Sequence, residues 1–571
     1  MQNSTDPDKT RVMPTKETRV IPRNEDSQEP SRHSGKAVSP EPRFVADARS
    51  DTWAGRPQHG QAVSRRSLLG AGVVGAAGLL LPAGARATRL LPTAQGDATV
   101  ELVIDLAVEP PTLDPALAYD VDGWSVVHSI YDAPVQLGPG GVLEMVAAEA
   151  MTQTDDVTWE IRLRPGLTFH NGEPLEASSI AFSVAHILDP ETASQVAGTV
   201  GVIEEVVEVD TLTARLHLSA PAPWLPSQIA PWLALLPPEY AGDPANDFAD
   251  NPVGTGPFRF VRWDRGSQIM LERNDEYQAS EAKGEPIAQR VAFRFVADGT
   301  TRVTDVVSGT SQLVRSVPFD QLEVVAEAAE VVAQPIAGCA FVRIPTDMAP
   351  FDNPEVRLAM NHAVDVDGIV AALLGGNGER LANLFVPEGL GYDEALSPHA
   401  YDPELARQLL ADAGYADGFS TRLAHTTSER ADLVAAVAGQ LAAVGIEVAL
   451  EPVETATFNA TWQDPEAAPL RYLTWRPLYD PYTLLGLVIS NTGFLSRYDD
   501  PVAQELIEAG AVETDPEERE SIYRELGQVL HDSPAGIYLW SLTSFYGVDR
   551  ETPPWTPRPD DWILPLVADE L

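Results

Sequence analysis

The chain has 571 residues, which is long enough for two or three domains. Its formal net charge of -45 predicts an unusually acidic surface. Residues 1–87 carry 13 Lys and Arg against 9 Asp and Glu, so the rest of the chain, with 26 against 75, holds all of the negative excess. Such a surface repels polyanions, and we expect no nucleic-acid partner and no anionic-membrane partner.

The scarcity of cysteine, lysine and suitably spaced histidine excludes several classes of site and enzyme. Cys339 is the only cysteine, so no intrachain disulfide and no cysteine-based metal site can form, and its run PIAGCAFVRI predicts a buried, inert thiol. Lys283 is the only lysine after residue 87, and its setting EAKGEP excludes a P-loop ATPase. The ten histidines lack ligand spacing, so we expect no metal ligands, and nothing predicts a cofactor.

Residues 1–87 have the pattern of a leader that precedes the folded protein. Residues 1–63 are polar and without apolar periodicity, which predicts disorder. Residues 64–87, SRRSLLGAGVVGAAGLLLPAGARA, combine paired arginines, a short apolar core and an Ala-x-Ala end, as is typical of a twin-arginine signal peptide. We expect export by this route to the periplasmic space or the extracellular face of the membrane, with cleavage after Ala87 and a translation start near Val63.

The first half of the remaining chain alternates strands, turns and helices. Apolar runs and period-two alternation predict strands at 99–108 and 157–163, and helical spacing predicts helices at 121–131 and in the segment ending at 188. Hairpins are predicted at 206–218 and at GTGPFRFVRW with QIMLERN.

The pattern changes after Pro335. Helices are predicted at 353–374, 403–413, 431–444 and 515–532, the first of them capped by Asn353 with Pro354 just inside. Strands are predicted at IEVALEPV and IYLWSLTSFYGV. A helix that leads into a buried strand, as at 431–453, favours an α/β lobe.

One motif raises the alternative of an enzyme. Ser280-Glu281-Ala282-Lys283 matches the S-x-x-K of penicillin-recognising hydrolases, but the downstream Lys-Thr-Gly is missing and the motif falls between a strand and a turn. We therefore expect no enzyme, and a secreted hydrolase stays the alternative from another class.

The stretch TWRPLYDPYTLL, residues 474–485, is the main candidate for a pocket. Its rings supply stacking area and its charges could orient a small molecule. We single out Trp475, Tyr479, Asp480 and Arg476. The alternative for Trp475 and Tyr479 is packing against a core, for Asp480 a turn cap, and for Arg476 a solvated side chain.

Long blocks resemble one family. LDPA, WEIRLRPGLTFHNGEPLEASSIAFS and PVGTGPFRFVRWDRGSQIMLERNDEY, followed by NPEVRLAMNHAVDVDGIVAALLGG, YDPELARQLLADAGY and DPEERESIYRELGQVLHDSPAGIYLW, resemble the extracellular solute-binding proteins of peptide/nickel ABC importers (family 5) in that family's order.

The resemblance implies an α/β, bilobal, periplasmic-binding-protein-like fold of type II and the three-part large class. Lobe I would comprise 97–335, with an inserted subdomain at about 138–252 and a C-terminal return at 540–571, and lobe II would comprise 336–539. Hinge segments would lie near 336–344 and 537–545, with ligand in the interlobe cleft. The implied partners are a small-molecule or peptide ligand and the ABC permease and ATPase subunits, and we expect a monomer.

The resemblance also bears on the ligand. Peptide-binding members resemble W-x-x-D-Y, in which the aspartate pairs with the α-amino group, but here Leu478 stands at that position. Thr474-Trp475 with Tyr479-Asp480-Pro481 is instead similar to nickel-binding members, although 489–498 lacks their ligand histidine. The ligand class therefore stays open between oligopeptides or related solutes and a metal-chelate. The role of the protein stays open between delivery to a permease and signalling as a sensor.

The resemblance adds two site candidates in lobe I and one structural residue. Tyr119 and Asp120, which follow LDPA, are similar to the lobe I loop that faces the pocket. Arg357 in EVRLAM is interpreted as a residue that braces a helix.

Overall fold

The structure is a computed structural model that describes residues 102–118, 120–387, 389–476 and 479–567. The expected extension at 1–63, the signal peptide at 64–87, Tyr119 and Leu478 lie outside these ranges. Among the described residues no helix has the length and apolarity needed to cross a membrane.

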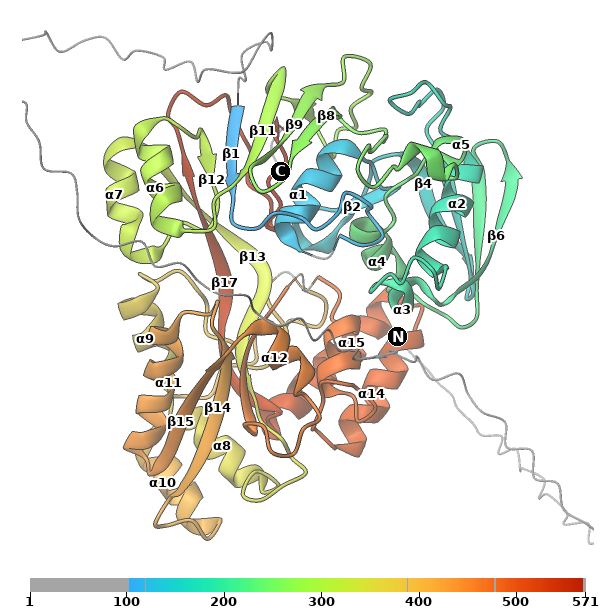
Figure 1. Cartoon of the computed structure of the whole chain (residues 1–571). Coiled ribbons are helices and arrows are strands. Elements are labelled where there is room, and N and C mark those ends of the chain that lie inside the picture. Colours follow the sequence, from blue (N-terminus) through green and yellow to red (C-terminus); the bar gives the residue numbers. More distant parts are fainter. Residues whose placement is uncertain (1–101, 119, 388, 477–478, 568–571) are drawn as a thin grey trace, which may run out of the picture. The chain divides into compact units, whose positions relative to one another are not determined.

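One large mixed sheet runs through the described part of the chain (Figure 1). We call the part built on β12, β1, β11, β9 and β8 lobe I and the part built on β15, β14 and β16 lobe II; β13 and β17 belong to both. The strand order is β15 (Ile446–Val453), β14 (Phe419–Thr426), β16 (Leu470–Trp475), β13 (Glu330–Arg343), β17 (Gly536–Val548), β12 (Leu313–Val314), β1 (Leu102–Leu106), β11 (Arg290–Phe295), β9 (Gln268–Arg273) and β8 (Phe258–Asp264). The mixed α/β class expected from the sequence is confirmed.

The long strands β13 and β17 run antiparallel to each other through both lobes, as Figure 1 shows. Their register shifts twice near the middle, between Pro335 and Cys339 and between Cys339 and Phe341. A bulge of this kind bends a strand pair and increases its twist. Both shifts lie at or beside the expected hinge segments 336–344 and 537–545, whose hinge role stays a prediction.

Lobe I also holds a separate four-stranded sheet with a core of its own. Its strands lie in the order β4 (Ala148–Asp155), β5 (Thr158–Leu163), β7 (Thr213–Leu218) and β6 (Ile203–Asp210). The helices of this region are α2 (Ala177–Leu188), α3 (Ala197–Val200), α4 (Leu225–Trp232), α5 (Pro238–Ala241) and the 3₁₀ turn η2 (Pro244–Asn246). This sheet falls inside the expected insert at 138–252, whose boundaries stay a prediction.

The rest of lobe I consists of short helices and two small ribbons. The helices are α1 (Val121–Ile130), α6 (Gly299–Ser308), α7 (Leu322–Ala328) and the 3₁₀ turns η1 (Pro139–Gly141) and η3 (Phe319–Gln321). The ribbons pair β2 (Val135–Leu137) with β3 (Leu143–Met145) and β10 (Glu285–Pro286) with β18 (Leu566–Val567). Through β18 and the buried residues Trp562, Ile563 and Leu564, the C-terminal segment packs into the core around β1.

Lobe II packs its helices on β13–β17 and on β14–β16. These are α8 (Pro354–His362), α9 (Val366–Leu373), α10 (Pro403–Asp412), α11 (Ala431–Ala443), α12 (Thr455–Ala460), α13 (Tyr482–Leu484), the π-helical turn η4 (Leu485–Ile489), α14 (Pro501–Val512) and α15 (Pro516–Asp532). The single helix expected at 353–374 is wrong: Asn353 caps α8, but Asp365 accepts from Gly368 N at 2.9 Å and starts a second helix.

Two local expectations are confirmed. The Arg357 guanidinium is buried and donates to the carbonyls of Pro534 and Phe351, which braces α8. Cys339 is buried, and desolvation raises the pKa of its thiol far above the ordinary value, so it is an inert core residue.

Candidate functional site

The carboxyl ends of the parallel strands in both lobes point to the middle of β13 and β17. In lobe II, β14 and β15 run parallel to β16, and β16 ends with Trp475 opposite Cys339 of β13. In lobe I, β11 and β12 run parallel to β1, and β12 is antiparallel to β17 with Val314 opposite Gly547. Ligands of open α/β sheets bind outside the carboxyl ends of such strands, so this is the region to search.

The candidate loop begins at the end of β16. Trp475 is partly buried against the core of lobe II, while the exposed Arg476 reaches away from it and donates to Asp561 Oδ2 at 2.7 Å. Asp561 belongs to the C-terminal segment that packs into lobe I. Arg476 therefore makes an ion pair between the lobes, although its side chain stays 36% exposed.

Asp561 is the centre of a buried charge network. Its side chain is 1% exposed and also accepts from Arg315 Nη1 at 2.9 Å and from Tyr546 Oη at 2.6 Å. Burial by itself would raise the pKa of Asp561, but Arg315 and then Arg476 hold it below its usual range. Arg315 in turn pairs with Asp122 at 2.8 Å, so the network extends from β16 to α1.

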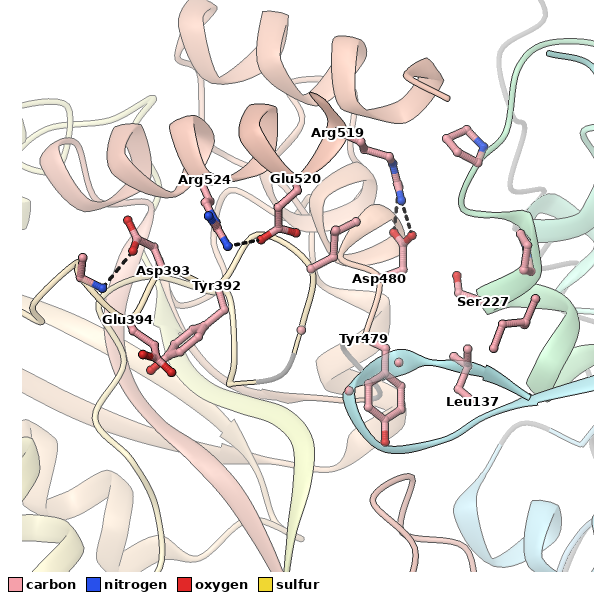
Figure 2. A pocket seen from close by; sticks show the side chains of 18 residues that line it. Leu137, Ser227, Tyr392, Asp393, Glu394, Tyr479, Asp480, Arg519, Glu520 and Arg524 are labelled. Atoms are coloured by element: carbon pink, nitrogen blue, oxygen red, sulfur yellow. Dashed lines mark hydrogen bonds and ion pairs between the residues drawn. The ribbon is translucent and has the colours of Figure 1, made fainter. Parts of the chain in front are cut away.

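Tyr479 is buried and lies beside the β2–β3 hairpin, as Figure 2 shows. A Cβ placed on Gly141, whose φ is +69°, would stand 3.0 Å from Tyr479 Cβ, so the hairpin approaches this ring closely. The Tyr479 carbonyl accepts from Leu390 N at 2.9 Å. The structure thus places Tyr479 between lobe I and the 389–395 loop of lobe II.

Asp480 has a structural role in this structure. Its carboxylate accepts two bonds from Arg519, at 2.7 and 3.1 Å, which Figure 2 draws. It accepts a third from Tyr482 N at 3.0 Å. The ion pair is nearly buried, with side-chain exposures of 7% for Arg519 and 10% for Asp480. The turn-capping alternative for Asp480 is therefore the one that the geometry favours.

Asp120 lies at the N-terminus of α1, which it caps by accepting from Gly123 N at 2.8 Å. Burial raises the pKa of the Asp120 carboxyl above its ordinary value. Its neighbour Asp122 accepts from the backbone N–H groups of Ala107 and Val108, directly after β1. The structure thus connects the end of β1 to the network of Asp561 through Asp122.

Two cavities of about 730 and 640 Å³ flank Tyr479 and are lined from both lobes. The larger one, drawn in Figure 2, has hairpin and α4 residues such as Leu137 and Ser227 on one side and Tyr392, Asp480 and Arg519 on the other. The smaller one lies at the register shifts of β13 and β17, lined by 333–337, 376–379 and 556–557 with Pro559. Volumes of this size suit small molecules or short peptides.

Further side chains join the lobes beside the larger cavity. The rings of Trp224 and Tyr482 stack with centroids 3.8 Å apart and an interplanar angle of 7°. Thr483 Oγ1 donates to Gln228 Oε1 at 3.3 Å. The C-terminal part of the candidate loop therefore contacts α4 of lobe I directly.

The sequence did not predict the ion-pair partners of two candidate site residues, which are Arg519 for Asp480 and Asp561 for Arg476. Arg519 lies in the predicted helix 515–532, to which the sequence assigns no role, and Asp561 lies in the expected C-terminal return at 540–571. Glu429 was also missed: it follows β14, and its Oε1 accepts from Thr474 Oγ1 at 3.0 Å. The available signal was positional, because 427–430 directly precede the predicted helix 431–444. The strand β14 before them, whose carboxyl end they follow, was not predicted.

Two observations bear on the metal-site and hydrolase alternatives. Within them, no group of three or more His, Cys, Asp or Glu side chains could hold a metal ion. Lys283, the lysine of the S-x-x-K motif, is buried and donates to Asp132 at 2.5 Å and to the Tyr131 carbonyl at 2.9 Å. Its ammonium group is therefore engaged away from Ser280, whose hydroxyl accepts the backbone N–H of Lys283 at 3.1 Å.

Two α/β lobes joined by paired long strands, with the strand ends of both lobes directed at one interlobe region, define a receptor of the type II periplasmic-binding-protein fold. The family model for bacterial extracellular solute-binding proteins, family 5 (middle part), matches residues 142–495, more than half of the chain. The chain belongs to this family, whose members are the substrate-binding proteins of ABC importers.

Individual proteins that are similar to this chain are also named for, or solved with, a solute that they bind. The glutathione-binding protein GsiB of Pectobacterium atrosepticum is 28% identical over 357 residues, 62% of this chain and 69% of the relative. The solved structure of DppA from Helicobacter pylori with the peptide STSA aligns with a TM-score of 0.67 and 23% identity, over 81% of this chain and 96% of that one. NikZ from Campylobacter jejuni with Ni(L-His) aligns with a TM-score of 0.67 and 18% identity, over 79% and 94%. At these identities the two solved structures support the fold alone.

Proposed function

We propose that this protein captures short peptides or related zwitterionic solutes between its lobes and delivers them to an ABC permease, without catalysing a reaction. The observation that carries the proposal is the placement of opposite charges at the strand ends of the interlobe region, with Arg476 after β16 and Glu429 after β14. Arg476 gives its Nη1 to Asp561 and is 36% exposed, so its other N–H groups could meet a ligand carboxylate. The carboxylate of Glu429 suits an ammonium group.

Closure would depend on contacts that exist only when both lobes touch the ligand. A ligand shifts an equilibrium between open and closed forms only by its difference in affinity for the two. Arg476 with Asp561 and Trp224 with Tyr482 are contacts between the lobes themselves, so they add to the stability of the closed form without depending on the ligand. The segments 336–344 and 537–545 would supply the hinges. A relative named as a glutathione-binding protein favours a small peptide-like solute.

A nickel or metal-chelate receptor is the second candidate, because Thr474-Trp475 with Tyr479-Asp480-Pro481 matches the pattern of nickel-binding members. The engagement of Asp480 by Arg519 removes that carboxylate as a metal contact in this structure. A chelate would then have to be held by the rings and by Arg476.

The deciding experiment is native mass spectrometry of the full chain purified from its own host, with metal analysis of the same sample and calorimetric titration with glutathione and trialanine. We expect a bound or titratable peptide-like solute at one per chain and no stoichiometric metal. Stoichiometric nickel together with an organic acid would favour the chelate receptor. Absence of binding to both peptides would overturn the proposal.

We also propose export in the folded state by the twin-arginine route, from the pattern at residues 64–87. Replacing Arg65 and Arg66 with lysine should retain the protein in the cytoplasm, as measured by fractionation of the producing cells. Unchanged export of the double variant would contradict the route without affecting the proposed ligand.

A further inference from the structure

The larger interlobe cavity has two chemically different walls. Its charged side chains all come from lobe II: Asp393, Glu394, Asp480, Arg519, Glu520 and Arg524. Among the described residues that line it, the lobe I wall is uncharged and mostly apolar, with Leu137, Leu143, Pro223 and Pro226 beside Ser227 and two glycines. Lobe I therefore offers a ligand in this cavity shape and apolar area instead of charge.

Most of the lobe II charges in this cavity are paired with one another. Asp480 accepts two bonds from Arg519, and Glu520 pairs with Arg524 at 2.9 Å, as Figure 2 shows. Glu520 also accepts from Gly391 N at 3.1 Å. Each pair sums to zero charge, so a ligand group that lies between these pairs and lobe I meets little net field from them.

Two leucines of the β2–β3 hairpin form one rung of the lobe I wall. Leu137 and Leu143 are directly opposite each other in this antiparallel pair, and both are half-buried. Opposed residues of a two-stranded ribbon point to the same face, so the two side chains make one continuous apolar surface. The hairpin tip at Gly141 approaches Tyr479 closely, and Figure 2 shows Leu137 beside that residue.

Helix α4 supplies the rest of the apolar wall. Pro226 lies in its first turn and is buried, and Pro223 shortly precedes the helix. The stacked rings of Trp224 and Tyr482 hold this end of α4 against lobe II. Leucine and proline side chains form no hydrogen bonds, so a polar ligand group placed against this wall would lose its water without replacement.

We propose that Leu137 and Leu143, with Pro223 and Pro226, form a specificity subsite for an apolar side chain of the captured solute. The inference rests on the proposed function, because it states which side chains of a peptide-like solute the receptor prefers. A leucine-sized group gains free energy by leaving water at this wall, whereas an amide of similar shape loses hydrogen bonds to water.

Peptide pairs of similar shape test the subsite. Titration calorimetry of the full chain compares trialanine with six tripeptides in which leucine or asparagine replaces each alanine in turn. Leu143→Asn and Leu137→Asn each make the wall polar from one strand of the hairpin, and Leu143→Met restores an apolar side chain. Leu409→Asn, at a half-buried leucine of α10 that lines neither cavity, is the matched control. Measurable binding of trialanine shows that a variant folds and closes.

At one position or more, the wild type should bind the leucine peptide about tenfold more tightly than its asparagine counterpart. Leu143→Asn and Leu137→Asn should reduce this ratio to about twofold or less, whereas Leu143→Met and Leu409→Asn should retain it. A wild type that binds trialanine but shows no preference for leucine would overturn the subsite. A preference that survives both asparagine variants would overturn it as well. A wild type that binds none of the seven peptides would overturn the proposed function, and this inference with it.

Discussion

Two ion pairs begin in the same short loop and differ in what they connect. Arg519 and Asp480 lie within lobe II, bond through two oxygens and are nearly buried. Arg476 and Asp561 connect lobe II to the segment that packs into lobe I, and the Arg476 side chain is 36% exposed. The first pair fixes the shape of the loop, whereas the second can form only when the lobes meet. Two charged residues of one short loop therefore have separate roles: Asp480 fixes the loop within lobe II, and Arg476 connects the two lobes.

The largest effect should come from breaking the pair within lobe II. Arg519→Met leaves Asp480 nearly buried without its counter-charge, and we expect the free energy of unfolding to fall by about 3 kcal/mol. Urea denaturation followed by tryptophan fluorescence measures this. The control is Arg524→Met on the same helix, since its pair with Glu520 is half-exposed and should contribute less than about 1 kcal/mol. Equal losses for the two variants would show that Arg519 does not brace the loop.

As the pH falls, lobe II should lose stability before the interlobe pair of Arg476 and Asp561 breaks. Burial, followed by the neighbouring His531 and His362, lowers the pKa of His399 to about 4, against about 6.5 when unfolded. The unfolded chain then binds the extra proton, so stability falls as the pH drops from about 6.5 to about 4. The full shift corresponds to about 3 kcal/mol, and because the ring is partly exposed we expect roughly 2 kcal/mol. The pKa of Asp561 is lowered by Arg315 and Arg476 despite burial, so its contribution is lost only below its ordinary carboxyl range.

Denaturation at pH 7, 5.5 and 4.5 tests the order of these events. His399→Gln should flatten the loss of stability between pH 6.5 and 4, because the ring that resists protonation is gone. An unchanged slope in this variant would assign the acid sensitivity to other groups.

Arg476→Met should have a smaller effect on stability and a larger one on binding. Asp561 keeps Arg315 and Tyr546, so we expect a loss of about 1 kcal/mol in unfolding free energy. Glutathione affinity should fall about fivefold, because closure loses an interlobe bond and the ligand loses a guanidinium. Arg497→Met, which breaks a pair with Asp347 inside lobe II, is the control and should leave affinity unchanged. Tighter binding by Arg476→Met would mean that the pair holds the lobes against the ligand.

The smallest effect should come from the stacked rings. Tyr482→Leu removes the stack on Trp224 but keeps apolar area, and we expect a loss of about 1 kcal/mol or less in peptide binding. Calorimetry measures it, with Tyr401→Leu as a control at an exposed tyrosine. Unchanged affinity would limit the interlobe contacts that matter to the Arg476–Asp561 pair.

Local signals in the sequence predicted much of the secondary structure. The strand at 446–453, the cap at Asn353 and the helix that follows Asp515 are all present, because period, capping side chains and turn residues act over a few neighbours. The long helix expected at 353–374 was wrong because Asp365 can cap a new helix, an effect that apolar periodicity alone does not register.

The sequence by itself determined the acidic surface, the absence of disulfides, the family blocks and the aromatic loop, since these depend on composition and on adjacent residues. Only the tertiary structure decided which charge in that loop pairs with which. Asp480 and Arg519 are 39 residues apart, Arg476 and Asp561 are 85 apart, and Glu429 and Thr474 are 45 apart. Such pairs form because strands distant in sequence end at one edge, and the sheet order that brings them there is fixed by packing of the whole core.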